Sequence, residues 1–346
     1  MIMKKIFNKL FKKNVDPEAQ SRITSDTLAH HRERIIAGGR RFKYPIQYVR
    51  HKLVFNTIII SVAVIIIMTI IGWWQLYPKQ NTSQFMYRLT TVIPVPVASV
   101  DGQSVLYSDY LMLYLSQLQY IETKDQVDIN SEDGKRQTDY LKKQTIDKVI
   151  ADAYAKKIAK KLNISVSDVE VESFIKAQRQ YDNGEQSSRS YEAVLLDYYN
   201  WTVKEYRYIV KNKLLSQKVA YEVDDKAKSI VSSASLEIEL DKAISLKSLS
   251  EKLSNQNNIK IEYGVSGLVS MFKQDGGLAV AASKLDKNSA PVVVKSTTGK
   301  GYYFVKLLDI NDSKVNYEYI RIPLTKFQDD LQGVIDSGKV HKYIKL

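Results

Sequence analysis

The sequence predicts an α+β protein that contains one transmembrane helix, a mainly helical domain and a small α+β domain. Three observations lead to this prediction. The run from Leu53 to Leu76 is apolar and uncharged, amphipathic helical patterns follow a short hairpin over 97–223, and helical and strand periods alternate over 224–346. We expect residues 1–52 to form a basic cytoplasmic tail and residues 77–96 to form a tether.

The positive charge of the chain is concentrated before the apolar run. The net charge is +13, and residues 1–52 alone contain 13 Lys/Arg and four Asp/Glu. Because the two signs nearly balance over the rest of the chain, no nucleic-acid-binding surface is expected. We interpret the tail as a mostly solvated, unspecific segment, and contact with anionic lipid headgroups is the alternative.

The apolar run is long enough to cross the ~30 Å hydrocarbon layer as a helix. Trp73, Trp74 and Tyr77 form an aromatic belt at its far end, and the Lys/Arg excess on the other side predicts a cytoplasmic N-terminus. A cleaved signal peptide is the alternative. It is disfavoured because its apolar core would span only ~7–15 residues before a small-residue cleavage site.

The absence of some residue types excludes several kinds of chemistry. The sequence has no cysteine, so thiol nucleophiles and thiolate metal sites are excluded. The segment between Tyr77 and Val340 has no histidine, which also excludes serine–histidine triads and histidine metal sites there. We expect neither a cofactor nor a metal.

The mainly helical domain opens with a predicted hairpin. Asp101-Gly102 is a strong turn signal between two short strands, and Ser108-Asp109 is placed to cap a first helix. A polar loop over 122–134 and a long helix over 138–162 follow.

Two capping boxes mark later helices of this domain. Ser167 and Glu170 predict the start of a third helix, which bears Phe174, and Thr202 and Glu205 predict the start of the last long helix. Between them lie a loop over 184–188 and a short helix over 191–199. Five helical segments are therefore expected after the hairpin.

The order of these features resembles a family. The Val-Ala-x-Val-Asp-Gly hairpin, the helix that starts at Ser108-Asp109-Tyr110, and the segments IDKVIADAYAKKIAKKLNISVSDVEVESFI and NWTVKEYRYIVKNKLLSQKV are similar to the SurA N-terminal domain of the PpiD and PrsA class of extracytoplasmic chaperones and foldases. The resemblance covers about 97–223. It implies a bacterial inner-membrane protein whose outer domains bind unfolded or newly exported polypeptides.

Tyrosines are abundant in the helical domain and supply contact area at low entropic cost. Packing in the core is the alternative role for each one. The side chains that we select as candidate client contacts are Tyr114, Phe174 and Tyr206.

Residues 224–346 show mixed periods. Helical patterns cover 224–233 and 246–253, strand alternation covers 259–263, and a short apolar helix follows Gly276-Gly277. Pro291 opens a strand that pairs, through a turn at Gly299-Lys300-Gly301, with the strand 302–307.

This part resembles a parvulin-type prolyl isomerase domain. In Gly301-Tyr302-Tyr303-Phe304-Val305-Lys306-Leu307, Tyr303 stands where the family has a histidine. Counted back without gaps, the family's Gly-Asp-Leu-Gly turn falls on 264–267. Its proline-pocket Met and Phe fall on Gln274 and Leu278, and a further Phe falls on Ser283.

The first parvulin strand is missing before Asp224. The segment 317–324 has a similar pattern, so we expect it to pair with the strand at 304–308 in a permuted domain, with Tyr319 at the second histidine position. Tyr303 and Tyr319 are the only candidate catalytic residues, and the loss of both histidines favours binding without efficient isomerisation. The alternatives are a weak prolyl isomerase, and a scaffold for an envelope or secretion complex with a secretion-machinery partner.

Overall fold

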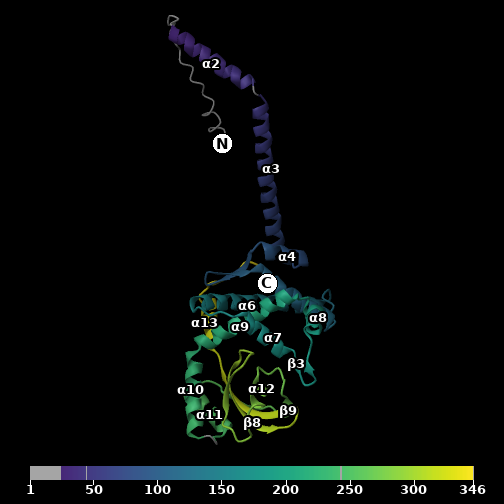
Figure 1. Ribbon diagram of the computed structural model, residues 1–346, viewed down its shortest axis with the longest axis vertical. Coiled ribbons are helices and arrows are strands. Elements are labelled where there is room, and N and C mark those ends of the chain that lie inside the picture. Colours follow the sequence, from purple (N-terminus) through teal and green to yellow (C-terminus); the bar gives the residue numbers. More distant parts are fainter. Residues whose placement is uncertain (1–24, 44, 242–243, 346) are drawn as a thin grey trace. The chain divides into compact units, whose positions relative to one another are not determined.

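The computed structural model describes residues 25–43, 45–241 and 244–345 (Figure 1). The chain divides into two compact units, Met1–Trp74 and Gln75–Leu346. Each unit is described separately below.

The first unit is helical where it is described. Helix α2 spans Ser25–Lys43, and helix α3 spans Pro45–Leu76 and ends in the second unit. Within the described ranges, Lys52–Leu76 is the one helix that is long and apolar enough to cross a membrane. The sequence pattern gave no sign of α2, and residues 1–24 of the expected basic tail lie outside the described part of the chain.

The expected tether contains a packed helix. Helix α4 spans Gln84–Val92, and the Ser83 side chain accepts a hydrogen bond from the backbone N–H of Met86 at its start. Met86, Tyr87 and Thr90 are buried, so this helix joins the core of the second unit. The prediction of a simple tether over 77–96 was therefore wrong.

The expected hairpin is present. Strands β1 (Pro96–Val100) and β2 (Gln103–Leu106) are antiparallel, and Asp101 and Gly102 both have positive φ, at 46° and 80°. Two successive residues with positive φ are what a tight two-residue hairpin turn requires.

A third strand comes from the far end of the sequence. Strand β10 (Val340–Lys342) pairs antiparallel with β1, which gives the sheet order β10-β1-β2. Ile344 is buried in the same core. This pairing differs from the expected division, which assigned all of 224–346 to the second domain.

Five helices follow the hairpin, as expected. They are α5 (Tyr107–Thr123), α6 (Glu132–Lys161), α7 (Asp168–Gln178), α8 (Ser188–Tyr199) and α9 (Val203–Val223). The small strands β3 (Gln180–Tyr181) and β4 (Gly184–Glu185) form a hairpin between α7 and α8.

The local capping predictions had different outcomes. Both capping boxes, at Ser167 and Thr202, are confirmed by reciprocal hydrogen bonds. The Ser108-Asp109 cap was wrong, because β2 leads directly into α5 at Tyr107, whose N–H donates to the Val95 carbonyl. Helix α6 starts earlier than the expected residue 138, because the Ser131 side chain caps it.

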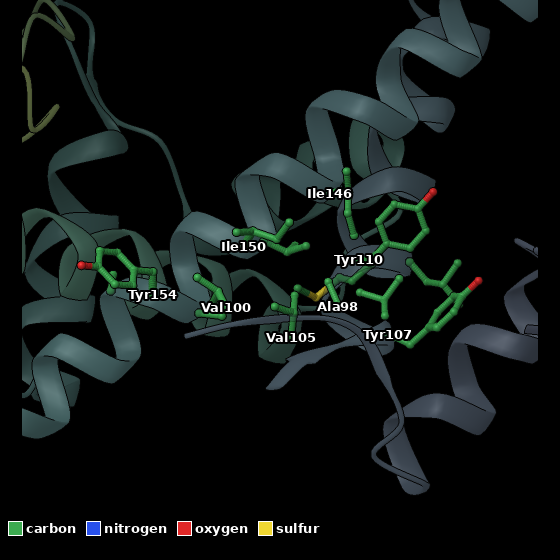
Figure 2. Packing of buried hydrophobic residues seen from close by; sticks show 14 of the residues in the cluster. Ala98, Val100, Val105, Tyr107, Tyr110, Ile146, Ile150 and Tyr154 are labelled. Carbon is green, nitrogen blue, oxygen red and sulfur yellow. The ribbon is translucent and has the colours of Figure 1, made fainter. Parts of the chain in front are cut away.

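The hairpin packs against α5 and α6 (Figure 2). Their buried side chains, labelled in the figure, are Ala98, Val100, Val105, Tyr107, Tyr110, Ile146, Ile150 and Tyr154. Tyr107 also donates its hydroxyl hydrogen to the carbonyl of Leu76 at 2.7 Å, which holds the last residue of α3 in this core.

The remaining elements form an α+β layer arrangement. Helices α10 (Asp225–Leu240) and α11 (Leu246–Asn257) cover one face of a sheet with the order β5-β9-β8-β7, and β6 pairs with β9. Helix α12 covers the other face. The bounds of these elements are β5 Glu262–Val265, β6 Val269–Ser270, α12 Leu278–Ala282, β7 Val292–Lys295, β8 Gly301–Ile310 and β9 Lys314–Pro323.

Two strand predictions for this part are borne out by the sheet. The expected hairpin around Gly299-Lys300-Gly301 is formed by β7 and β8. The segment 317–324, which was expected to replace the missing first strand, lies mostly in β9 and pairs antiparallel with β8, with Phe304 opposite Ile320. The strand expected at 259–263 is displaced to β5. Helices α10 and α11 run beyond the expected ends at 233 and 253.

Helix α13 (Lys326–Asp336) follows β9 and packs against the helical domain, where Phe327 and Leu331 lie in the same core as the hairpin, α5 and α6. The Asp224 side chain holds the start of this helix. Its buried carboxylate accepts from the N–H of Ala227 at 2.9 Å, and from the N–H groups of Thr325 and Lys326 at 2.8 and 3.1 Å. One side chain therefore caps both α10 and α13.

Candidate client-binding surface

A cavity of about 430 Å³ opens between α5, α6, α9 and α13 and the turn after β7. We call it the α6–α9 cavity. Its volume is in the range of known ligand pockets. The apolar side chains that line it are Met112, Leu113, Val149, Ala151, Ile209, Ala220 and Phe327.

Both parts of the second unit contribute to this cavity. Thr298 and Gly299, in the β7–β8 turn, line it beside α9. Gln217 of α9 donates a hydrogen bond from its side-chain amide to the Thr297 carbonyl at 2.6 Å, and this contact holds the turn in place. The cavity therefore depends on the docking of the sheet domain against α9.

The charged groups around the cavity are mostly paired. Lys148 forms an ion pair with Asp152, which also accepts from the Ser216 hydroxyl at 3.1 Å. Asp109 accepts from Lys156 and from the Tyr208 hydroxyl at 3.1 and 3.0 Å. Burial lowers the pKa of Lys156, but Asp109 and Tyr208 outweigh burial and leave that pKa raised, so the ammonium stays protonated. The result is an apolar floor with a polar rim.

A second apolar surface runs along α5, α8 and α9. We call it the aromatic ladder, and it consists of stacked or edge-packed rings that are half-buried. Tyr120 stacks on Tyr199 at 5.6 Å, and Tyr199 stacks on Trp201 at 4.5 Å. Trp201 stacks on Tyr206, whose hydroxyl lies 2.7 Å from that of Tyr191.

The polar groups of the aromatic ladder are partly buried or paired. The indole N–H of Trp201 has no acceptor within the described ranges, and its nitrogen is buried and out of reach of a bound chain. Burial raises the pKa values of Tyr191 and Tyr206, so both hydroxyls stay protonated. One of them donates to the other, which leaves one hydroxyl hydrogen of the pair for a further acceptor. Leu196 and Val194 of α8 are exposed beside the ladder, at 54% and 37%. Flat apolar rings with adaptable donors suit binding to many different chains.

The three expected contacts of the helical domain lie in different environments. Tyr206 belongs to the aromatic ladder. Phe174 is half-buried on α7, where the Lys213 ammonium lies 4.8 Å from its ring centroid. Tyr114 is 4% exposed and stacks on Tyr110, so it is a core side chain. The structure therefore does not bring the three together.

The expected parvulin-like residues converge on the α12 face of the sheet. Tyr303 and Tyr319 have ring centroids 5.7 Å apart, and Leu278 packs in the same cluster. Gly264 gives Tyr319 its room, because a side chain at that position would overlap the tyrosine ring. Tyr303 and Leu278 are only 6% and 4% exposed, so the chain's own side chains fill this face.

Gln274, expected at a proline-pocket position, instead makes hydrogen bonds to α7. Its side-chain amide donates to the carbonyl of Ala177 at 3.2 Å, and its oxygen accepts from Gln178 at 2.8 Å. It therefore links the loop before α12 to the end of α7. Ser283, the remaining family position, ends α12 as a C-cap residue.

A half-buried carboxylate contact was missed by sequence reasoning. Tyr317 donates its hydroxyl hydrogen to Asp275 at 2.6 Å, and the same carboxylate accepts from the N–H of Leu278 at 2.8 Å. Burial raises the pKa of Tyr317, and burial also raises that of Tyr303. These phenols are neutral hydrogen-bonding groups near neutral pH and not bases. The local signal for Asp275 was its position three residues before Leu278, which suits a helix cap.

Within the described ranges, no group of three or more His, Cys, Asp or Glu side chains is placed to hold a metal ion.

Comparison with known protein families identifies the family of the helical domain. The family model of the SurA-like N-terminal domain matches residues 46–220, so the chain belongs to this family. The match starts before the expected boundary at Val97 and includes α3 and α4. No curated protein and no solved structure matches the chain. Members of the family are extracytoplasmic and bind unfolded polypeptides in general, so the domain indicates a chaperone-type function.

Proposed function

We propose that this protein is a membrane-anchored extracytoplasmic chaperone that binds newly exported polypeptides. Helix α3 spans the inner membrane, and the unit Gln75–Leu346 faces the compartment outside it. The observation that carries the proposal is the α6–α9 cavity, an apolar site whose walls come mostly from the SurA-like domain and are completed by α13 and the β7–β8 turn. The client places apolar side chains in this cavity and lies along the aromatic ladder.

Binding to unfolded chains needs apolar surface that stays exposed in the folded protein. The half-buried rings of the aromatic ladder and the exposed Leu196 beside them meet this need. The polar rim of the cavity supplies hydrogen-bonding groups for the client backbone, which would otherwise lose its bonds to water.

The test uses the full chain in lipid nanodiscs and light scattering from a denatured client. We expect the loaded discs to suppress client aggregation and empty discs to have no effect. A220F fills the cavity from α9 and should weaken suppression, whereas K211F places the same ring at an exposed position of the same helix. Circular dichroism establishes that both variants fold. Equal suppression by A220F and K211F would remove the cavity from the proposal.

A failure to suppress aggregation, combined with capture of one stoichiometric partner, would support the scaffold alternative instead.

A second candidate activity is weak prolyl isomerisation on the α12 face. The convergence of Tyr303 and Tyr319 favours it, since both stand at positions where parvulins have histidine. The buried, filled state of that face opposes it, because an isomerase must admit a proline ring. We therefore expect the rate with a proline tetrapeptide to equal the uncatalysed rate. A rate above background that falls in Y303F would establish the enzyme.

A further inference from the structure

Helix α4 carries an apolar stripe on its outer face. Phe85 and Val92 are 69% and 79% exposed, and the next residue, Ile93, is 53% exposed. Residues 85, 88 and 92 lie on one side of a helix, and the opposite side is buried through Met86 and Tyr87. The stripe therefore cannot turn into the core.

The start of α4 is held close to the end of α3. The N–H of Asn81 donates to the Gln75 carbonyl at 2.9 Å, and the Asn81 side-chain amide donates to the Gln75 side chain at 3.1 Å. Ser83, the N-cap of α4, follows two residues later. At 3.8 Å between successive Cα atoms, the Cα atom of Ser83 lies within about 12 Å of the Gln75 carbonyl oxygen.

This upper bound keeps the start of α4 close to the headgroup layer. The polar regions add about 5–8 Å to each side of the hydrocarbon core. If α3 spans the bilayer with Trp73 and Trp74 at its outer edge, α4 begins at headgroup level. Arg88 lies between the two apolar positions and is 60% exposed, although it also pairs with Glu205. An arginine there can reach lipid phosphates while its stem covers apolar surface.

We propose that α4 is an interfacial helix whose stripe of Phe85, Val92 and Ile93 inserts into the outer leaflet of the membrane. This inference rests on the proposed membrane anchor. A helix with one buried face and one face of apolar and basic side chains is typical of segments that lie in the bilayer interface.

The test exploits the absence of cysteine from the sequence. Single-cysteine variants F85C and V92C of the full chain carry an environment-sensitive fluorophore in lipid nanodiscs, with quenchers attached either to lipid or dissolved in water. L240C is the matched control, because Leu240 of α10 and Val92 are equally exposed, at 79%. V64C reports on the middle of α3.

We expect blue-shifted emission and lipid quenching at positions 85 and 92, and aqueous quenching at 240. Lipid quenching at 64 combined with aqueous quenching at 85 and 92 would overturn the interfacial role but leave the anchor intact. Such a result would assign the stripe to a protein partner. Aqueous quenching at 64 would instead refute the anchor itself.

Discussion

Replacing Asp224 with alanine should loosen two helices at once. Asp224 is 2% exposed, and its carboxylate accepts three backbone N–H groups from the starts of α10 and α13. Thr325, the N-cap of α13, makes no side-chain cap of its own. Since one N-cap is worth about 0.5–2 kcal/mol, losing both should cost about 1–4 kcal/mol of unfolding free energy.

The neighbouring residue provides a close control. Asp225 is also in the first turn of α10, but its side chain is 91% exposed and pairs only with Lys228. Removing it should change stability by less than about 0.5 kcal/mol. D224N retains one acceptor oxygen and should fall between D224A and D225A.

Hydrogen exchange of α10 and α13, measured on the full chain in nanodiscs, distinguishes these expectations. D224A should speed exchange in both helices, and it should weaken client binding because Phe327 of α13 lines the cavity. If D224A and D225A exchange alike, or if only α10 responds in D224A, the double-cap reasoning is wrong.

Three further changes test other parts of the structure. G301A should lower the free energy of unfolding by about 3 kcal/mol or more, because Gly301 has φ of 147° and a Cβ there would overlap the backbone of β9. Gly333 has open space, so G333A should be tolerated, and denaturant midpoints compare the two variants. Y221F removes a hydroxyl whose one hydrogen is shared between the carbonyls of Gly301 and Ser296, at 2.6 and 3.0 Å, and should lower the thermal midpoint through a loss of about 1–3 kcal/mol. An unchanged midpoint would contradict the role of this contact. The hydrogen bond from Lys218 and the capping box lower the pKa of Glu170 to about 2, so its contribution to stability is present above the unfolded pKa of about 4.3 and is lost as pH falls toward about 2. In urea titrations, E170Q should reduce the small loss of stability over this acidic pH range, and an unchanged loss would contradict the role of Glu170.

Local signals in the sequence predicted local structure well. The boxes at Ser167 and Thr202 formed as expected, because both partners of each box lie within one helical turn. The turn at Asp101-Gly102 also formed as expected, because it depends on two adjacent residues. Helix α4 was missed because it is short and lies in a segment whose prolines indicated an extended tether.

Contacts between distant residues were harder to predict. Nothing near Asp224 indicates that it caps a helix about a hundred positions later, and nothing near Val340 specifies β1 as its partner. The pairing of β9 with β8 was predicted only through a family resemblance. Within the candidate client-binding surface, Tyr206 of the aromatic ladder was predicted from the sequence as a client contact. It did not supply the cavity, whose walls come from four helices and a turn that meet only in the folded chain.

On the proposed topology, the pairing of β10 with β1 also constrains the order in which the protein assembles during its own export. Tyr343 and Ser99 are in contact across 244 positions of sequence, so the three-stranded sheet stays incomplete until that whole stretch is available to fold. During this interval β1 presents an unpaired edge, which is a surface that recruits other strands. Such a long-range closure is also slow compared with helix formation. A chain in this state is itself an unfolded polypeptide of the kind that the proposed chaperone would bind.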